Sequence, residues 1–441
     1  MQSKYRGAIR MTERVILSYA LEQLQNKGIE HASGSVSKGT TYEMNVEANK
    51  MTLIRTVFNN SLSLYVIKDN KSGSISVNKL DKEAIDKAIT DIIEIAESSE
   101  PDPAHAIAEY QPAAQFSVGP AEPDMDLMYQ RLEQFLTTVR EQFPKIMLEN
   151  VYFKFNHNTR FIANTNGVDY TVSKGIYSFT SMFSGHDGDK SSSFNYTGFS
   201  TQDINQELLA FGSQKYLLEQ SSNQIDTQSL SGKFVGDVIV TPDCLGDFLG
   251  YLFDITIFDG ALISGTSVYK DSLGKQVADP RLVVHSWPVS SEIADGYFLT
   301  GDGYRAENCT IIDHGVLKTF LLSLYGANKT GLARGVNNGG CYVIEPGTKS
   351  LEEIIGHVKR GILLARYSGG SPSQNGDFSG VAKNSYYIED GKIQYPISET
   401  MISGNLVEML QNITEISKER VNFGWGIYPW IGFSNLTISG K

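Results

Sequence analysis

The stretch Thr241–Lys275 reads TPDCLGDFLGYLFDITIFDGALISGTSVYKDSLGK, and its first half predicts a helix. Thr241 is a suitable N-cap, Pro242 fits the first helical position, and Asp243 complements the positive end of the helix dipole. Apolar side chains then recur at helical spacing, which predicts that one face of this helix is buried. These apolar residues are Leu245, Phe248, Leu249 and Leu252.

Before this stretch, the chain alternates between amphipathic helices and strand-rich segments. Turn signals at Asn59-Asn60, Asp69–Gly73 and Asn166-Gly167 divide the strands. The order predicts two successive units of helix, antiparallel meander and helix, joined by a proline-rich linker at about 100–123. The expected helices span 12–27, 81–98, 126–142 and 203–220, and the strand-rich segments span 30–79 and 146–198.

After Gly232, glycine becomes frequent, strands are short and helices are few. The expected helices are 242–253, 350–367 and about 404–418, the second of which begins with a capping box. The fold class predicted is therefore α+β. We expect an N-terminal α+β region at 1–230 and a β-rich C-terminal domain at 231–441.

Composition excludes several classes of protein. The net charge of −12 disfavours a binder of nucleic acid, which needs clustered Lys and Arg. No apolar run reaches the roughly 18 residues that span a bilayer, and residues 1–15 lack the apolar core of a secretory signal. Three cysteines without CxxC spacing disfavour a disulfide framework or a zinc site. A cytoplasmic location is the simplest expectation.

No metal-binding motif stands out among the seven histidines. None has a second His three to five residues away, so HExxH and the one-residue-longer HExxxH are absent. A site assembled from scattered residues such as Asp247, Asp254 and His285 stays open as a hypothesis. Asp247 and Asp254 are seven residues apart and share a helix face, for which solvation is the favoured interpretation.

Residues 369–410 read GGSPSQNGDFSGVAKNSYYIEDGKIQYPISETMISGNLVEML, which predicts a loop, two strands and a helix. This segment closely resembles the C-terminal signature of the TldD/PmbA family, also called the modulator-of-DNA-gyrase family. The resemblance continues through NTNGVDYTVSKGIYSF (164–179), SGTSVYKDSLGKQVADPRLVVHSWP (264–288) and GDGYRAENCTIIDHGVLKTFLLS (301–323). It covers most of the chain from about residue 15.

The family has two branches, and the resemblance places this chain in one of them. In the TldD branch, a HExxxH helix and a late Cys bind the metal of a peptidase. The PmbA/TldE branch lacks these ligands and pairs with TldD as a heterodimer. Here Gly246 and Tyr251 stand where the two His would be, Asp247 stands near the Glu, and Phe423 stands near the Cys. Gly and Phe provide no ligand atom.

The resemblance implies a non-metal subunit of a cytoplasmic peptidase that acts on unfolded peptides or matures peptide antibiotics. This chain would be catalytically incomplete alone and would hold no cofactor. A metal, expected to be zinc, would be bound by a TldD-like partner, and peptide contacts are guessed at Asp377, Phe378 and Asn405. Two alternatives stay open: a homodimeric regulator of DNA gyrase or a toxin system, and a self-sufficient peptidase with an unrecognised metal site.

Overall fold

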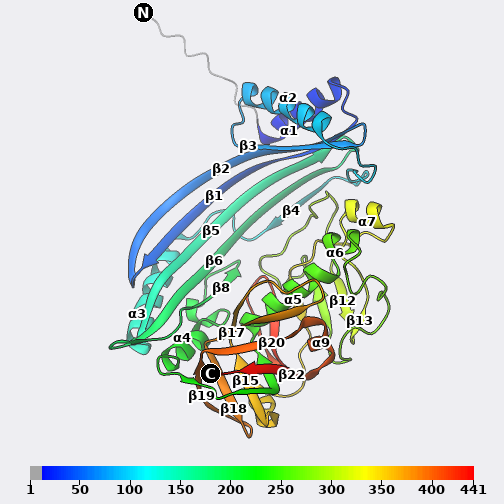
Figure 1. Cartoon of the computed structure of the whole chain (residues 1–441). Helices are drawn as coiled ribbons and strands as arrows, with labels where there is room; N and C mark the ends of the chain where they lie inside the picture. Colours follow the sequence, from blue (N-terminus) through cyan, green and yellow to red (C-terminus); the bar gives the residue numbers. More distant parts are fainter. Residues whose placement is uncertain (1–11) are drawn as a thin grey trace, which may run out of the picture.

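The computed structural model describes residues 12–441, which form two packed parts, each built on one large β-sheet (Figure 1). Residues 1–11 lie outside the described part, and so does most of the segment for which the sequence predicts no secretory signal. Within 12–441, no helix combines the length and apolar character needed to cross a membrane. The structure is mixed α and β, as the sequence predicts.

The first sheet has eight strands in the order β3-β2-β1-β5-β6-β4, with β7 and β8 also paired to β6. β1 pairs antiparallel with β2 on one side and with β5 on the other, so the two predicted units merge into one sheet. The strands are β1 (His31–Glu47), β2 (Lys50–Lys68), β3 (Lys71–Val77), β4 (Ala114–Val118), β5 (Ile146–Asn164), β6 (Asp169–Asp187), β7 (Lys190–Ser191) and β8 (Asn195–Thr201).

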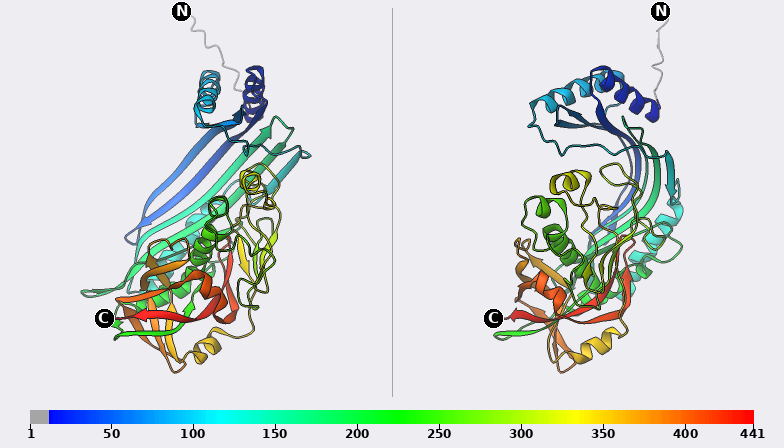
Figure 2. Two further views of the ribbon diagram at one scale, coloured as in Figure 1. Left: turned by 45° about the vertical axis from the view of Figure 1, so that its right-hand side comes forward. Right: turned by 90° about the vertical axis from the view of Figure 1, so that its right-hand side faces the viewer.

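Three helices cover one face of this sheet: α1 (Glu13–Asn26), α2 (Lys82–Ser98) and α3 (Met125–Gln142). Strand alternation explains which face is covered. On β1, Val36 packs with α1 and α2, and Met44 packs with α3, while the intervening Ser33 and Ser35 face the other side. The strands curve, and the C-terminal part lies on their concave side (Figure 2).

The turn expected at Asn59-Asn60 is wrong, because both residues lie inside β2 and pair with Gly39 and Lys38 of β1. Continuous pairing along the neighbouring strand overrides the local turn preference of Asn. The expected turns near Asp69 and Asn166 do connect β2 to β3 and β5 to β6. Part of the segment expected as a linker forms β4, which pairs parallel with β6.

The second sheet has fourteen strands, and its main path runs β13-β12-β11-β14-β22-β10-β15-β18-β19-β9. Its strands are β9 (Gln228–Ser229), β10 (Lys233–Val240), β11 (Val284–Ser286), β12 (Cys309–Asp313), β13 (Val316–Leu317), β14 (Tyr342–Ile344), β15 (Arg360–Leu364), β16 (Arg366–Gly369), β17 (Asp377–Lys383), β18 (Ser385–Glu389), β19 (Lys392–Ser398), β20 (Thr400–Asn405), β21 (Ile413–Asn422) and β22 (Ile427–Ser439).

The remaining helices are the 3₁₀ helix η1 (Leu208–Ala210), α4 (Gln214–Asn223), α5 (Pro242–Thr256), α6 (Asp259–Ile263), α7 (Leu324–Thr330), α8 (Leu351–His357) and α9 (Leu406–Gln411). Of these, η1 and α4 pack with α3 and the first sheet, and the others connect or cover strands of the second sheet. The helix expected at 350–367 is wrong beyond His357, because residues 360–364 pair with β10 as strand β15. The helix expected at about 404–418 ends at Gln411, where the chain turns into β21.

The predicted amphipathic helix is α5, and its four predicted apolar residues are buried in the main core of the C-terminal part. Burial of each such side chain contributes about 1.5–3 kcal/mol to stability. Thr241 does not cap α5 with its side chain, contrary to the expectation. Its hydroxyl donates to the carbonyl of Ala365 instead, which ties the start of α5 to the end of β15.

The first turn of α5 also carries a carboxylate that joins the two parts of the molecule. Asp243 Oδ1 accepts hydrogen bonds from Ser213 Oγ, next to α4, and from Thr197 Oγ1 of β8, the latter at 2.8 Å. Burial raises the pKa of Asp243 to about 6, although these two hydrogen bonds favour the charged form. The folded state therefore binds a proton at this carboxyl between about pH 4 and 6, where the unfolded chain does not.

This titration predicts that folding stability rises as the pH falls from 7 to 5. The raised pKa makes the ionised form costly in the folded state, so Asp243 should contribute about 1 kcal/mol more stability at pH 5 than at pH 7. The Asp243→Asn variant keeps an oxygen acceptor but does not titrate. Urea midpoints measured at both pH values should change less for the variant; an identical pH response in both chains would contradict the prediction.

Candidate functional site

Two of the residues that the sequence places in the position of a metal motif, Gly246 and Phe423, lie near the same tyrosine. Gly246 lies on α5, and Phe423 lies in the turn between β21 and β22. A Cβ at Gly246 would lie 3.5 Å from the ring of Tyr428, and the Phe423 ring centroid lies 6.1 Å from that of Tyr428. Phe423 and Tyr428 are both buried. Tyr428 therefore lies next to both positions.

Asp247 and Tyr251 lie on α5, and both are near Tyr196 of β8. Asp247 is exposed at the surface, yet the surrounding protein desolvates its carboxylate and raises its pKa. Burial raises the pKa of Tyr196 in β8, and the negative charge of Asp247 raises it further. Tyr251 is partly buried and packs against the main core. The region therefore combines one carboxylate with several tyrosines.

Three exposed aromatic side chains surround this region, and we call them the aromatic rim: Phe194, Tyr196 and Trp425. The guanidinium carbon of Arg366 lies 4.1 Å from the ring centroid of Phe194 and 5.5 Å from that of Tyr196. Its Nη1 atom is buried and has no hydrogen-bond partner among residues 12–441. The rim is thus an exposed aromatic surface backed by a partly buried guanidinium, and exposed aromatic side chains suit the capture of a polypeptide.

Strand β8 carries Tyr196 of the rim and lies next to Trp425. β8 pairs with β6 along one side. On its other side, Ser200 donates its backbone N–H to the carbonyl of Phe423 at 2.8 Å, so the turn that carries Trp425 is held against the strand. A Cβ at Gly198 would meet the Trp425 ring at 3.5 Å. The indole is thus in ordinary contact range of β8, whereas glycine at 198 is required by the Phe179 carbonyl oxygen of β6, which a Cβ would approach to 2.7 Å.

The scattered metal site considered from the sequence does not form a cluster. Among the residues that the structure describes, no group of three or more His, Cys, Asp or Glu side chains is placed to hold a metal ion. His285 lies on β11, where its ring nitrogens contact Thr310 at 2.9 Å and Glu345 at 3.2 Å. Asp247 and Asp254 are both exposed on α5, where they share a face as the spacing predicts.

The three residues guessed to contact peptide have visible structural contacts. Asn405 is the N-cap of α9 and accepts hydrogen bonds from the N–H groups of residues 407 and 408. Its Nδ2 also donates to Asp377 Oδ1 at 2.8 Å. Phe378 is buried against Phe248 of α5, with ring centroids 5.3 Å apart. A role of these residues in peptide binding stays a prediction.

Sequence reasoning did not find Tyr196, Arg366 or Tyr428. These residues lie on β8, β16 and β22, which are far apart in the chain and adjacent to α5 only after folding. The only local signal was the unusual sequence GWGIYPW at 424–430, which places Trp425 between two glycines. Gly426 is needed there, because a Cβ would lie 2.5 Å from the Tyr428 hydroxyl oxygen.

The contact between Tyr428 and the Gly246 position predicts that a histidine at residue 246 lowers the stability of the fold. A Cβ at Gly246 would be in ordinary contact with Tyr428, so the imidazole of Gly246→His has to pack beside that ring, and we expect the free energy of unfolding to fall by about 1–3 kcal/mol. Gly250 lies one turn further along α5, with nothing within 4 Å of its Cβ position. Gly250→His, the matched control, should change stability by less than about 0.5 kcal/mol. Equal urea midpoints for the two variants would contradict this account.

Two sequence models of one family match the chain. The PmbA/TldA metallopeptidase C-terminal domain matches residues 231–440, and the PmbA/TldA metallopeptidase domain 1 matches residues 33–96. The metalloprotease PmbA of Escherichia coli O157:H7 is 25% identical over 426 residues, which cover 90% of this chain and 91% of that protein. A zinc metalloprotease TldD homolog of Saccharolobus solfataricus is 28% identical over 238 residues, covering 50% of this chain and 51% of that protein.

Solved structures show the same fold. TldE from Thermococcus kodakarensis superposes with a TM-score of 0.82 at 20% identity, covering 96% of this chain and 100% of that one. A protein of Bacteroides thetaiotaomicron described as a putative modulator of DNA gyrase gives a TM-score of 0.83 at 21% identity, covering 98% and 100%. The two matching domains, the full-length relatives and the fold together show that this chain belongs to the TldD/PmbA family.

Proposed function

We propose that this chain is the PmbA/TldE-like subunit of a cytoplasmic TldD/TldE-type peptidase complex and binds no catalytic metal itself. The observation that carries the proposal is Tyr428, whose ring lies against Gly246 and next to Phe423. A catalytic zinc needs three protein ligands and an open position for water or substrate. Gly246 and Phe423 offer no ligand atom, and the ring of Tyr428 lies next to both positions.

In this proposal, a TldD-like subunit supplies the metal, which we expect to be zinc. The metal would activate water for attack on the peptide bond when bound in that subunit. The present chain would contribute a binding surface for unfolded peptides, including precursors of peptide antibiotics. One relative is named a zinc metalloprotease TldD homolog, which supports zinc chemistry within the family.

The aromatic rim is the part of this chain that we propose to contact the peptide or the partner subunit. β8 is paired with β6 along one edge, so an extended peptide could add to its other edge above the turn at 423–425. Strand addition gives affinity through main-chain hydrogen bonds and requires little sequence preference. The rim side chains and Arg366 would then hold the peptide side chains.

The proposal predicts that cleavage depends on two different chains. An unfolded peptide labelled with a fluorophore and a quencher should be cleaved when this chain is co-purified with a TldD-like partner, and not by this chain alone. The partner alone is the matched control. Equal cleavage by this chain with and without the partner would contradict the proposal and favour a self-sufficient peptidase. Recovery of DNA gyrase instead of a TldD-like chain from native lysate would favour the regulatory alternative.

The rim can be tested separately in the reconstituted pair. Trp425 and Tyr196 are 40% and 46% exposed, so changing both to Ala should leave the fold intact. Truncating two aromatic contacts should lower kcat/KM or the affinity between the chains by about tenfold. Tyr152→Ala is the matched control, since this tyrosine is 41% exposed on β5. Equal effects of the control and the double variant would count against a specific role for the rim.

A further inference from the structure

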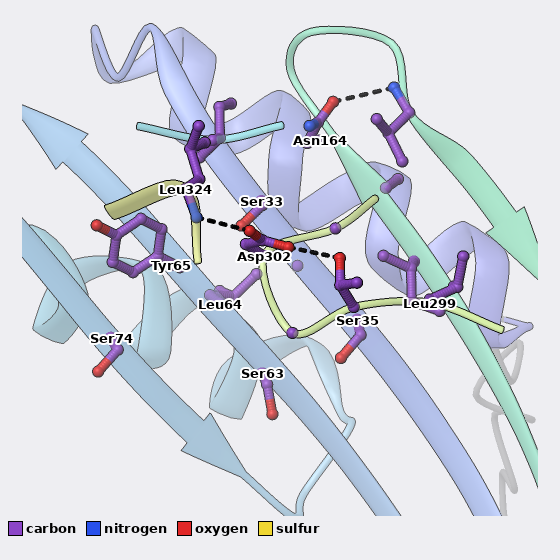
Figure 3. A pocket seen from close by; sticks show the side chains of 18 of the residues that line it. Ser33, Ser35, Ser63, Leu64, Tyr65, Ser74, Asn164, Leu299, Asp302 and Leu324 are labelled. Atoms are coloured by element: carbon purple, nitrogen blue, oxygen red, sulfur yellow. Dashed lines mark hydrogen bonds between the residues drawn. The ribbon is translucent and has the colours of Figure 1, made fainter. Parts of the chain in front are cut away.

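A cavity of about 640 Å³ lies between the two parts of the molecule, away from the aromatic rim (Figure 3). Its floor consists of strands β1, β2, β3 and β5 of the first sheet. The loop 299–303, the start of α7 and Asn338 close it from the C-terminal part. Volumes of this size hold small molecules or short peptides. None of the three rim residues lines this cavity.

The floor of the cavity is unusually rich in hydroxyl groups. Strand register aligns them, since Ser35 of β1 lies opposite Ser63 of β2, which lies opposite Ser76 of β3. Ser33 and Ser74 also line the cavity, and neither hydroxyl has a hydrogen-bond partner within residues 12–441. Figure 3 shows both side chains at the cavity floor. The floor can therefore hydrogen-bond a polar ligand at several points.

Arg160 of β5 adds a positive charge to this floor. Its Nη2 donates to Ser35 Oγ at 3.1 Å, and no carboxylate within the described chain comes near enough to form an ion pair with it. The residue is accessible through the cavity, yet the surrounding protein desolvates the guanidinium and lowers its pKa. An arginine in this setting lacks the counter-charge that partly buried charges normally have.

The wall contributed by the C-terminal part carries one carboxylate, Asp302, which already has hydrogen-bond and ion-pair partners. Asp302 accepts hydrogen bonds from the N–H of Leu324 at 2.8 Å and from Thr300 Oγ1, as Figure 3 shows. It also pairs with Arg334 at 3.4 Å. The cavity is therefore left with a single uncompensated positive charge, at Arg160. A single guanidinium offers one bidentate site, which one carboxylate can fill and neutralise.

We propose that this cavity is a second binding site, which holds a polar ligand through a single carboxylate paired with Arg160. The guanidinium fork matches the geometry of a carboxylate, and the serine hydroxyls can bond the polar groups next to it. Two sources share this chemistry: the C-terminus of a peptide and a small hydroxy acid. The peptide source rests on the proposed function, whereas the hydroxy acid source is independent of it.

Isothermal titration of the full chain tests the site with defined probes. N-acetyl-trialanine should bind one to one, and N-acetyl-trialanine amide, which lacks the carboxylate, should bind roughly tenfold to a hundredfold more weakly. Tighter binding of 3-hydroxybutyrate than of the peptide acid supports the site and assigns it to the small acid. In that case the proposed function is unaffected, because partner-dependent peptide cleavage is measured separately. Inorganic phosphate should bind more weakly than either acid.

Variants test whether the charge of Arg160 determines binding independently of the fold. Arg160→Gln should remove the preference for acid over amide, and Arg160→Lys should retain part of it. Ser33→Leu should block binding by filling the cavity without changing its charge. Arg140→Gln, an exposed arginine of α3 outside the cavity, is the matched control and should bind like the parent chain. Thermal unfolding of each variant checks that the chain is folded.

Three results would overturn the proposal. One is equal binding of peptide acid and amide by the parent chain. Another is an unchanged acid preference in folded Arg160→Gln. The third is tighter binding of phosphate than of both carboxylic acids.

Discussion

Helix α5 depends on burial of its apolar side against the second sheet, and the rest of the C-terminal part is arranged around that contact. Leu245, Phe248, Leu249 and Leu252 point into the same core, to which strands β10, β15 and β22 contribute. Phe248 also contacts Phe378, so the family signature segment packs onto α5. The exposed side of the helix is thereby fixed in place, and whatever stands at residues 246, 247 and 251 faces the same region as β8.

In this chain the fixed region is filled with aromatic side chains. Tyr428 lies against Gly246, Phe423 stacks on Trp425 with ring centroids 5.7 Å apart, and Arg366 lies over Phe194. This arrangement places aromatic rings beside Gly246 and along β8. The position is suited to hold a polypeptide through apolar contacts and hydrogen bonds. It also explains how a member of a peptidase family can retain the architecture of its relatives while its own helix carries no histidine.

The sequence predicted the parts of the molecule that depend on local patterns. The apolar spacing of α5, the capping box of α8 and the turn at Asn166 all appear as expected, because neighbouring residues determine them. The sequence-based predictions were wrong where pairing with a distant strand determines the secondary structure. Asn59 and Asn60 lie in a strand because β1 pairs with them, and residues 360–364 form a strand because β10 accepts them. For the same reason the sequence did not single out Tyr428 and Arg160, since their neighbours in the fold come from distant segments of the chain.

We propose that this chain binds no catalytic metal, because Gly246 and Phe423 offer no ligand atom and the Tyr428 ring lies next to both. Elemental analysis of the isolated full chain, purified without chelators and supplied with zinc, tests it most directly. The account predicts less than about a tenth of an equivalent of any transition metal, since a stable catalytic site requires three protein ligands. A content near one equivalent that survives gel filtration would contradict it.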